Sequence, residues 1–347
     1  LCEKGRPRVC RTKVADSAAY VSVPIHSSVS GTVKEIKKVI MPAAGGGRRH
    51  HHVGRVNGAR PCGMSPTGDQ NEAAADRCGA RFGSRRSRRR RLSGARELNV
   101  PPDKKIDTLI VNVAECEPYI TSDHREALEN GKNVLAGIYK IKEILDVHRV
   151  IIAIEDNKPD AIEALTRIAD DPKMDPNDEV RVLKLHASYP QRGKGAGAGG
   201  NGQKVPAGGL PADVGCLVMN IGSVSFLASY MRTGMPLTMK RVTVDGSAVQ
   251  NPQNVDCAHR HKIREVMEFC GGYKEEPQKL IMGGPMMGVA VTTDELPVLK
   301  QNNGLLAFGA EEARLLEPTD CIRCGRCVAA CPMNLCPQSL KICGAQG

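Results

Sequence analysis

Four cysteines near the carboxyl end of the chain follow one another at fixed intervals, in the order Cys321-x-x-Cys324-x-x-Cys327-x-x-x-Cys331-Pro332. Three thiols that are each separated by two residues lie on one tight loop, so they can face one side of a cubane-shaped iron–sulfur cluster. Zinc sites usually pair two separated Cys-x-x-Cys knuckles instead. The run therefore predicts an iron–sulfur protein, with Cys321, Cys324, Cys327 and Cys331 as metal ligands.

The same spacing occurs in bacterial ferredoxins, where the fourth cysteine ligates the second of two clusters. Cys321, Cys324 and Cys327 would then bind one [4Fe-4S] cluster and Cys331 would bind another. A second motif with the remaining ligands does not follow, since the later cysteines are Cys336 and Cys343. We therefore expect the chain to be truncated within a two-cluster domain.

The positive charge of the chain is local. Of a formal net charge of +11, nine charges come from residues 43–98, which hold thirteen arginines, no lysine and four acidic residues. A nucleic-acid-binding domain is expected to show a basic face on a folded module, whereas this stretch is rich in Gly and Arg and has no hydrophobic periodicity. We therefore expect no nucleic-acid partner, and no regular structure over 43–98.

The fourteen cysteines and the apolar segments bear on where the protein works. The first residues lack the apolar core of a secretory signal, so the cysteines indicate a reducing compartment and metal ligation rather than a disulfide framework. No apolar run approaches the roughly 20 residues of a membrane helix. The chain begins with Leu1 instead of methionine, so we expect it to start within a longer protein.

Buried strands alternate with helices in the central part of the chain. Residues 106–113, 149–155 and 180–185 are predicted strands, and residues 122–137 and 159–170 are predicted helices. Strands that alternate with helices are typical of an α/β domain with a parallel sheet.

Two smaller β-rich regions flank this domain. Residues 15–42 alternate polar and apolar side chains and are expected to turn at Ser30-Gly31. Further on, a hairpin that turns at Asp245-Gly246 precedes a helix over 263–270 and a strand over 279–282, which favours a small β-grasp-like module.

Several motifs of this chain are shared with one protein family. They are the segments 114–125 (AECEPYITSDHR), 205–214 (VPAGGLPADV), 244–249 (VDGSAV), 283–288 (GGPMMG) and 321–335 (CIRCGRCVAACPMNL). With these motifs the chain resembles the C subunit of the Rnf (or Rsx) electron transport complex, over roughly residues 15–42 and 100–340. The core of that family is similar to the NADH- and flavin-binding subunit of respiratory complex I.

The resemblance implies a modular fold: an α/β core with a parallel sheet, a small N-terminal β barrel-sandwich module, a β-grasp module and a truncated ferredoxin-like α-helical cluster domain. The expected boundaries are 1–42 for the barrel-sandwich-like module, 43–98 for an aberrant glycine-loop region, 99–235 for the flavin/NADH-binding domain, 236–300 for the soluble-ligand-binding β-grasp module and 301–347 for the cluster domain.

The resemblance also implies a function. The chain would be a peripheral redox subunit of a membrane-bound, ion-translocating NADH/ferredoxin oxidoreductase complex, on the cytoplasmic face of the cell membrane. It would pass electrons between NAD(H), FMN and two [4Fe-4S] clusters, with NADH, ferredoxin and the other Rnf/Rsx subunits as partners. The cofactors would carry the chemistry, so no side chain is expected to be catalytic. The direction of electron flow and the pumped ion, Na⁺ or H⁺, do not follow from the sequence.

In this relation the flavin lies over the strand end that carries Asn112, Glu115, Cys116 and Glu117, with Asn220 as a second asparagine on the flavin side. Ligands of open parallel sheets bind at the carboxyl ends of strands. From the residues alone, an ordinary loop pair is the more frequent interpretation of Glu115 and Glu117, and Asn220 is equally a strand-end turn residue. The family usually has glycine where Val113 stands, and a Cβ there would crowd a cofactor.

The family also carries a glycine-rich loop, approximately Gly-x-Gly-Gly-Ala-Gly-Phe-Pro, where this chain has residues 85–97 (RRSRRRRLSGARE). Synonymous codons for that stretch, read one base later, encode Gly-Leu-Gly-Gly-Ala-Gly-Phe-Pro, and the same shift gives family-like residues at 192–204 and 257–262. We therefore expect compensated frameshifts in these segments. Two alternatives follow: a defective or truncated family member without cofactor-dependent activity, and a generic ferredoxin-like electron carrier.

Overall fold

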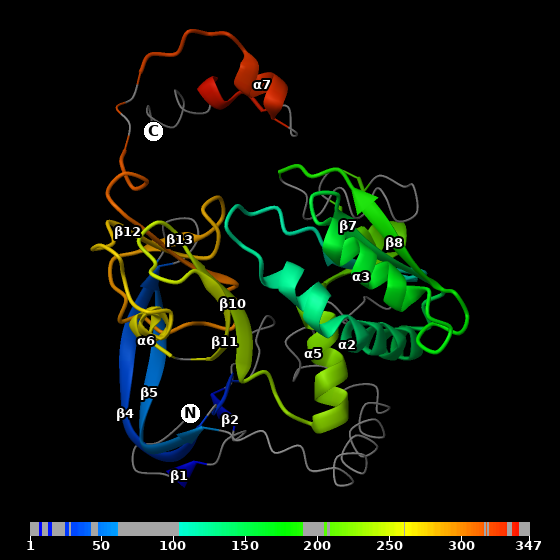
Figure 1. Cartoon of the computed structure of the whole chain (residues 1–347), viewed down its shortest axis with the longest axis horizontal. Coiled ribbons are helices and arrows are strands. Elements are labelled where there is room, and N and C mark those ends of the chain that lie inside the picture. The colour runs from blue at the N-terminus through cyan, green and yellow to red at the C-terminus, as the bar shows by residue number, and fades with distance from the viewer. Residues whose placement is uncertain are drawn as a thin grey trace.

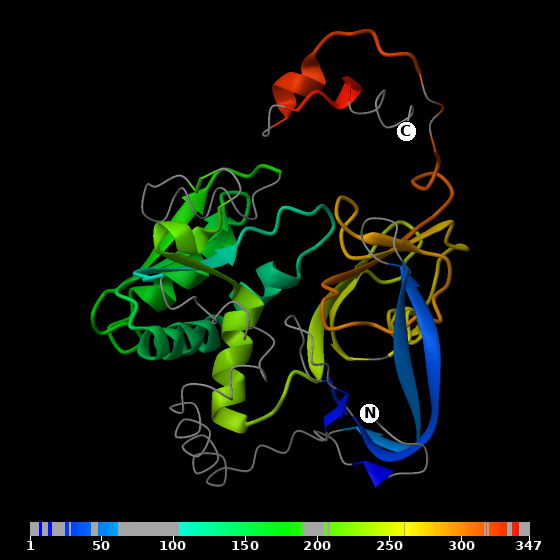
Figure 2. The same cartoon turned by 180° about the vertical axis from the view of Figure 1, so that it is seen from behind.

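The computed structural model describes residues 7–8, 13–15, 25–27, 29–42, 48–61, 104–189, 205–206, 209–259, 261–315, 317, 319–331 and 335–339. An α/β domain and a mixed β-sheet lie next to each other, and a long β-hairpin runs beside the mixed sheet (Figures 1 and 2). The predicted parallel sheet of the α/β core is confirmed. The segments 62–103 and 190–204, which hold the expected glycine loop and one expected frameshift, lie outside the described residues.

The parallel sheet has four strands in the order β8-β7-β6-β9. They are β6 (Thr108–Val113), β7 (Arg149–Glu155), β8 (Val180–Leu185) and β9 (Cys216–Asn220). Every residue of β6 is buried, as expected for a central strand that is covered on both faces. The predicted bounds of β7 and β8 are confirmed.

Three helices pack on one face of this sheet: α2 (Ser122–Leu145), α3 (Pro159–Ala169) and α5 (Ile221–Thr233). The strand residues alternate between this core and the opposite face, where Ile110, Ala153 and Cys216 form a smaller cluster. Val113, which stands where the family has glycine, is fully buried in the core beneath the helices. Its side chain is therefore used for packing.

Helix α2 is longer than the sequence predicts. It does not end at Gly137 but continues to Leu145 and stops at Asp146, which adopts a left-handed conformation. Gly137 instead lies against the backbone of α5, since a Cβ there would lie 2.2 Å from the carbonyl oxygen of Val224. The glycine permits close helix packing, and the expected helix end at this position is wrong.

The second domain is a five-stranded mixed sheet, which we call the mixed-sheet domain. It contains β10 (Met239–Asp245), β11 (Gln253–Ala258), β12 (Lys279–Met282), β13 (Val289–Val291) and β14 (Gly304–Phe308), in the order β11-β10-β14-β12-β13, and helix α6 (Ile263–Phe269). Strands β10 and β11 form the predicted hairpin. Gly246, with φ of 112°, begins a connection that extends to β11, so the turn is longer than Asp245-Gly246 alone.

The N-terminal part contains β1 (Pro7–Arg8), β2 (Lys13–Ala15), β3 (Ile25–His26), β4 (Val29–Pro42) and β5 (Arg48–Pro61). The predicted turn at Ser30-Gly31 is wrong, because both residues lie within β4, where the pairing with β5 shifts its register. Strand β5 also occupies part of the segment predicted to lack regular structure. Strand β5 is held by backbone hydrogen bonds to β4, although its sequence lacks the alternation that predicts a strand.

The cysteine run lies on a C-terminal segment that stands apart from both sheets (Figures 1 and 2). Its short helix α7 spans Arg326–Ala330 and places Cys327 within the helix and Cys331 directly after it. Among the described residues, no helix is both long and apolar enough to cross a membrane.

Candidate functional site

The strand order of the parallel sheet reverses at β6. From β6 the chain moves outward through β7 and β8, and then returns to place β9 on the other side of β6. In open α/β sheets, ligands bind at such a reversal, outside the carboxyl ends of the two strands. Asn112 of β6 and Asn220 of β9 are paired in register at this end. The topology therefore brings together two residues that were predicted from the sequence to lie beside the flavin.

Both asparagines use their side-chain oxygens to fix local backbone. Asn112 Oδ1 accepts a hydrogen bond from the Ala114 amide at 2.9 Å. Asn220 is the N-cap of α5: its Oδ1 accepts from the Gly222 amide at 2.9 Å, and its Nδ2 donates to Asp123 Oδ2 at 2.6 Å. The pair shapes the crevice and links the first turns of α2 and α5.

Glu115 serves as the cap of α2. Its carboxylate accepts hydrogen bonds from the Ser122 hydroxyl (3.1 Å) and from the backbone amides of Asp123 (2.9 Å) and His124 (3.1 Å). A carboxylate at a helix N-terminus satisfies orphan donors and opposes the helix dipole. Glu115 is buried, so any role toward a flavin would be added to this structural one.

Glu117 reaches the mixed-sheet domain. Its Oε2 accepts from the Met286 amide at 3.0 Å, whereas its Oε1 is buried without a hydrogen-bond partner among the described residues. Cys116, between the two glutamates, is a half-buried free thiol. Glu115, Cys116 and Glu117 therefore share the strand end with Asn112, but they turn toward different neighbours.

Two acidic residues of this edge were not predicted from the sequence. Asp123 pairs with Asn220, and Glu155 ends β7 with only 1% of its surface exposed. The position of Glu155 was available from the sequence, because parallel strands end at one common edge and Glu155 closes the predicted strand over 149–155. Burial raises the pKa of Glu155, and the charge of Glu115 adds to this effect.

The predicted effect of Glu155 on stability depends on pH. Because its pKa is raised in the folded state, the folded chain holds the proton more tightly than the unfolded chain. The free energy of unfolding should therefore fall as the pH rises from the ordinary glutamate range through the raised pKa. Glu155→Gln should remove this loss. Urea unfolding at a series of pH values should therefore show the free energy of unfolding of the variant rising relative to that of the wild type across this interval.

A matched control for this variant is Glu163→Gln on α3, since the Glu163 side chain is 73% exposed. The difference in free energy of unfolding between this control and the wild type should stay constant over the whole pH series. Parallel curves for Glu155→Gln as well would contradict the assigned burial effect.

The cap at Asn220 gives a second prediction. Asn220→Ala removes the oxygen that caps α5 and the partner of Asp123, and should lower the free energy of unfolding by about 1–2 kcal/mol. Asn220→Ser keeps a capping oxygen and should regain most of that loss. Denaturant unfolding of the three chains measures the effect, and equal losses in both variants would argue against the capping role.

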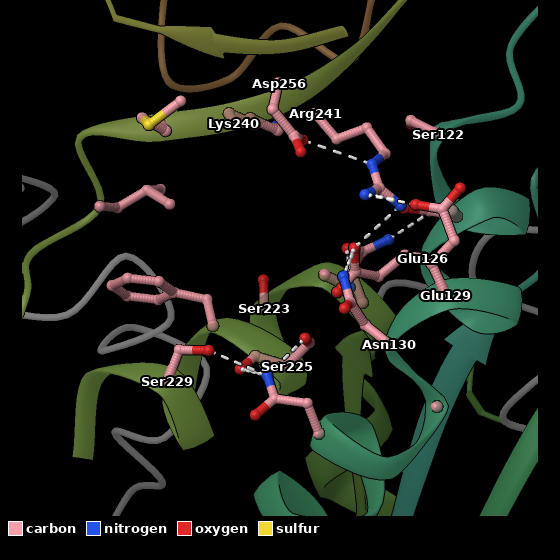
Figure 3. A pocket seen from close by; sticks show the side chains of 18 of the residues that line it. Ser122, Glu126, Glu129, Asn130, Ser223, Ser225, Ser229, Lys240, Arg241 and Asp256 are labelled. Carbon is pink, nitrogen blue, oxygen red and sulfur yellow. Dashed lines mark hydrogen bonds and ion pairs between the residues drawn. The ribbon is translucent and has the colours of Figure 1, made fainter. Parts of the chain in front are cut away.

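A cavity of about 780 Å³ opens beside this edge and extends between α2, α5 and β10 (Figure 3). The first turns of the two helices contribute Ser122, Asp123, Asn220 and Ser223, and the Ser223 side chain points into the open space. This volume lies within the range of small-molecule sites. Of the five sequence-predicted flavin residues, Asn220 lines the cavity, and the other four lie at the strand end outside its wall.

One wall of the cavity is an ion-pair cluster around Arg241 (Figure 3). Its guanidinium lies 2.7 Å from Glu129 and 3.5 Å from Glu126, both on α2, and 3.4 Å from Asp256 on β11. Burial opposes ionisation of Glu129, but hydrogen bonds from Arg125 and Arg241 hold its pKa below the ordinary value. The cluster joins the α/β domain to the mixed-sheet domain.

The four motif cysteines are accessible thiols. Cys321, Cys324 and Cys327 are exposed and Cys331 is half-buried. The loop between them is wound through left-handed residues at Arg323 and Gly325, and the Arg323 amide donates to Cys321 Sγ at 3.4 Å. Among the described residues, no three His, Cys, Asp or Glu side chains lie together in position to hold one metal ion.

Three of the other described cysteines differ from this set, whereas Cys336 is exposed and Cys116 is half-buried. Cys216, Cys257 and Cys270 are buried, and burial raises the pKa of each thiol, that of Cys257 to about 11. Such thiols behave as small apolar core residues. Exposure therefore separates the predicted ligands from the structural cysteines.

Four family models match successive parts of the chain. They are the RnfC barrel sandwich hybrid domain over residues 4–50, the Nuo51 FMN-binding domain over 93–229, the SLBB domain over 241–290 and a 4Fe-4S binding domain over 316–335. Among solved structures, an NAD⁺-reducing [NiFe]-hydrogenase in the air-oxidized state matches 70% of this chain and 47% of its own chain, with a TM-score of 0.50 and 14% identity. That likeness concerns the fold alone.

Curated relatives are much more similar in sequence. The C subunit of the Na⁺-translocating ferredoxin:NAD⁺ oxidoreductase complex of Acetobacterium woodii is 36% identical over 98% of this chain and 76% of its own length. Its counterpart in the proton-translocating complex of Clostridium ljungdahlii is 42% identical over 72% of this chain, and the C subunit of the ion-translocating oxidoreductase complex of Rhodobacter capsulatus is 38% identical over 71%.

The matches cover 53% of the Clostridium relative and 47% of the Rhodobacter relative, so the chain spans about half the length of these two. The Acetobacterium match is the more extensive one, since it covers nearly all of this chain and three-quarters of the relative at well above 30% identity. The chain therefore belongs to the family of C subunits of ion-translocating ferredoxin:NAD⁺ oxidoreductase complexes.

Proposed function

We propose that this chain is the peripheral redox subunit of a membrane-bound, ion-translocating NADH/ferredoxin oxidoreductase complex. Electrons would pass between NAD(H), FMN and [4Fe-4S] clusters, with the other subunits of the complex as partners on the cytoplasmic face of the membrane. The observation that carries this proposal is the presence, on one chain, of a crevice at a parallel-sheet reversal and a ferredoxin-type cysteine run.

The crevice suits a flavin mononucleotide in its donor chemistry. At the α5 N-terminus the Gly222 amide is bonded to Asn220 Oδ1, and Ser223 in the same turn offers a backbone amide of the kind that binds phosphate. Glu117 Oε1 is a buried acceptor without a partner among the described residues, which suits a hydroxyl donor of a ribityl or ribose group. We propose Asn112, Glu115, Cys116, Glu117 and Asn220 as flavin-side residues, with Ser223 added from the cavity wall.

The C-terminal thiols suit an iron–sulfur cluster, because thiolates are the ligands that such clusters require. In this proposal Cys321, Cys324 and Cys327 hold one [4Fe-4S] cluster and Cys331 contributes to another. The clusters would supply one-electron transfer. The chain would supply the ligands and the Arg323 amide, whose hydrogen bond to Cys321 Sγ is of the type that tunes cluster potentials.

The finer fold assignment is part of the same proposal. Residues 1–42 would form the barrel-sandwich module, residues 99–235 the flavin/NADH-binding domain, residues 236–300 a β-grasp module and residues 301–347 a ferredoxin-like domain. Residues 43–98 would be the aberrant glycine-loop region. The mixed sheet of β10 to β13 with its single described helix α6 supports the β-grasp assignment, and β14 at residues 304–308, beyond the proposed boundary, completes the same sheet.

The competing proposal is a family member that has lost its cofactors, because residues 85–97 are arginine-rich where the family has its glycine loop. Reconstitution of the purified full chain with FMN, iron and sulfide under anaerobic conditions separates the two proposals. The redox proposal expects about one bound FMN per chain after gel filtration, together with bound iron. A chain that retains neither group would favour the cofactor-free alternative.

A further inference from the structure

The segment 115–121 joins β6 to α2 and carries three of the proposed flavin residues. Its second half is held by the mixed-sheet domain rather than by its own sheet. Glu117 accepts from the Met286 amide (3.0 Å), and Tyr119 donates its hydroxyl hydrogen to Glu312 Oε1 (3.1 Å). The Tyr119 ring also meets Phe308 edge-on, with centroids 5.3 Å apart. These contacts place the segment against a second domain along most of its length.

Apolar packing continues the same attachment. Ile120 is 2% exposed and clusters with Leu306 and Phe308 of β14. Gly304, at the start of β14, makes room for it, since a Cβ there would lie 2.2 Å from Ile120 Cδ1. The mixed-sheet domain is thus shaped around this side chain.

The attachment ends in a closed ring of hydrogen bonds. The Thr121 amide donates to Thr243 Oγ1 (3.0 Å), the Thr243 hydroxyl donates to Asn254 Oδ1 (2.9 Å), and Asn254 Nδ2 donates to Thr121 Oγ1 (2.9 Å). Thr243 and Asn254 are paired across β10 and β11, and Thr243 is 3% exposed. Thr121 and Asn254 are half-buried, so the ring is centred on the buried Thr243 hydroxyl. Removal of that hydroxyl is costly, because it leaves the Thr121 amide and Asn254 Oδ1 without this partner.

Thr121 directly precedes the helix turn that Glu115 caps. Ser122, Asp123 and His124 supply the three donors to the Glu115 carboxylate. A displacement of Thr121 therefore moves the donors that hold Glu115, and Asp123 in turn holds Asn220. The ring on β10 and β11 is connected in this way to both sides of the crevice.

We propose that Thr243 is a positioning residue for the flavin crevice. Through Thr121 it fixes the 115–121 segment, so the mixed-sheet domain sets the placement of Glu115 and Glu117 at the sheet edge. The consequence for flavin binding rests on the proposed function above, whereas the fixing of the segment does not.

The first arm of the test needs no cofactor. Hydrogen exchange of the full chain is followed by mass spectrometry for wild type, Thr243→Val, Thr243→Ser and Thr238→Val. Valine removes the hydroxyl at nearly constant volume, serine keeps it, and Thr238 is a buried threonine (6% exposed) just before β10 that serves as matched control. Peptides covering residues 113–124 should exchange about tenfold faster in Thr243→Val only.

The second arm measures FMN itself, by quenching of its fluorescence on titration with each chain. Thr243→Val should weaken FMN binding about tenfold, and Thr243→Ser should bind like the wild type, as should Thr238→Val. Unchanged exchange in Thr243→Val, or equally faster exchange in Thr238→Val, overturns the fixing role. Equal FMN affinity of wild type and Thr243→Val overturns its consequence for the crevice. A wild type that binds no FMN counts against the proposed function, and the exchange arm then still decides on Thr243.

Discussion

Replacement of Cys324 by alanine should abolish one iron–sulfur cluster of the reconstituted chain. Cys324 is the middle thiol of the run, and Cys321 and Cys327 are too few to hold the cubane without it. Relative to the wild type, the iron content should fall by about four atoms per chain and the visible charge-transfer absorbance should fall with it. Iron and sulfide assays together with the absorption spectrum measure the effect.

The matched control is Cys336→Ala, because Cys336 is an exposed thiol on the same segment that lies outside the spaced run. Hydrogen bonds from Ser339 lower the pKa of Cys336, which makes its thiol easier to ionise. The control should keep the wild-type iron content. Equal iron in wild type and Cys324→Ala would contradict the assignment of the run as the ligand set.

Substitution of Gly137 by alanine should destabilise the α/β domain by about 3 kcal/mol. The new Cβ would lie 2.2 Å from the carbonyl oxygen and 2.9 Å from the carbonyl carbon of Val224, which are backbone atoms of α5. Backbone atoms cannot rotate away, so α2 and α5 must separate and lose packing in the core. The free energy of unfolding from urea or guanidinium titration measures the loss.

Gly131→Ala is the control within the same helix. A Cβ at Gly131 would meet Ile168 Cδ1 at 2.6 Å, which is the far end of a flexible side chain that can change its rotamer. The gain in helix propensity of up to about 1 kcal/mol should then leave this variant neutral or more stable. Similar losses in both variants would mean that glycine flexibility, and not helix contact, governs the effect.

Gly137 also shows where prediction from the sequence stops. The strands over 149–155, 180–185 and 279–282 were predicted with their observed bounds, because short apolar or alternating runs between polar residues are typical of strands. A glycine inside a predicted helix can mark either the end of the helix or a close contact with a neighbouring element. Only the neighbouring helix shows that the missing Cβ at Gly137 is needed for contact.

Other elements are held by backbone pairing and could not be recognised from their side-chain pattern. Strand β5 carries no alternation of polar and apolar residues and was predicted to be irregular, yet twelve of its fourteen residues pair with β4. The Ser30-Gly31 pair has the composition of a turn but lies at a register shift within β4, a place where glycine is also used. Helix α5 and strand β14 were not predicted at all.

The candidate site also combines features that were expected before the structure with features that only tertiary contacts reveal. The meeting of Asn112 and Asn220 followed from the family resemblance, because the strand that ends at Asn220 was not among the predicted strands. The partners of Glu115, Glu117 and Thr243 were not, because they depend on how α2 and the mixed-sheet domain are placed. Sequence motifs located the crevice, and the tertiary contacts identify what holds it in shape.

Anaerobic titration of the reconstituted full chain with NADH, followed by optical and electron paramagnetic resonance spectroscopy, tests the central claim most directly. The proposed redox role predicts that NADH bleaches the bound flavin and that the signal of a reduced [4Fe-4S] cluster then develops. The Cys324→Ala chain should retain the flavin change and lose the cluster signal from that site. A chain whose clusters are reduced by dithionite but not by NADH would contradict this role and favour a ferredoxin-like carrier.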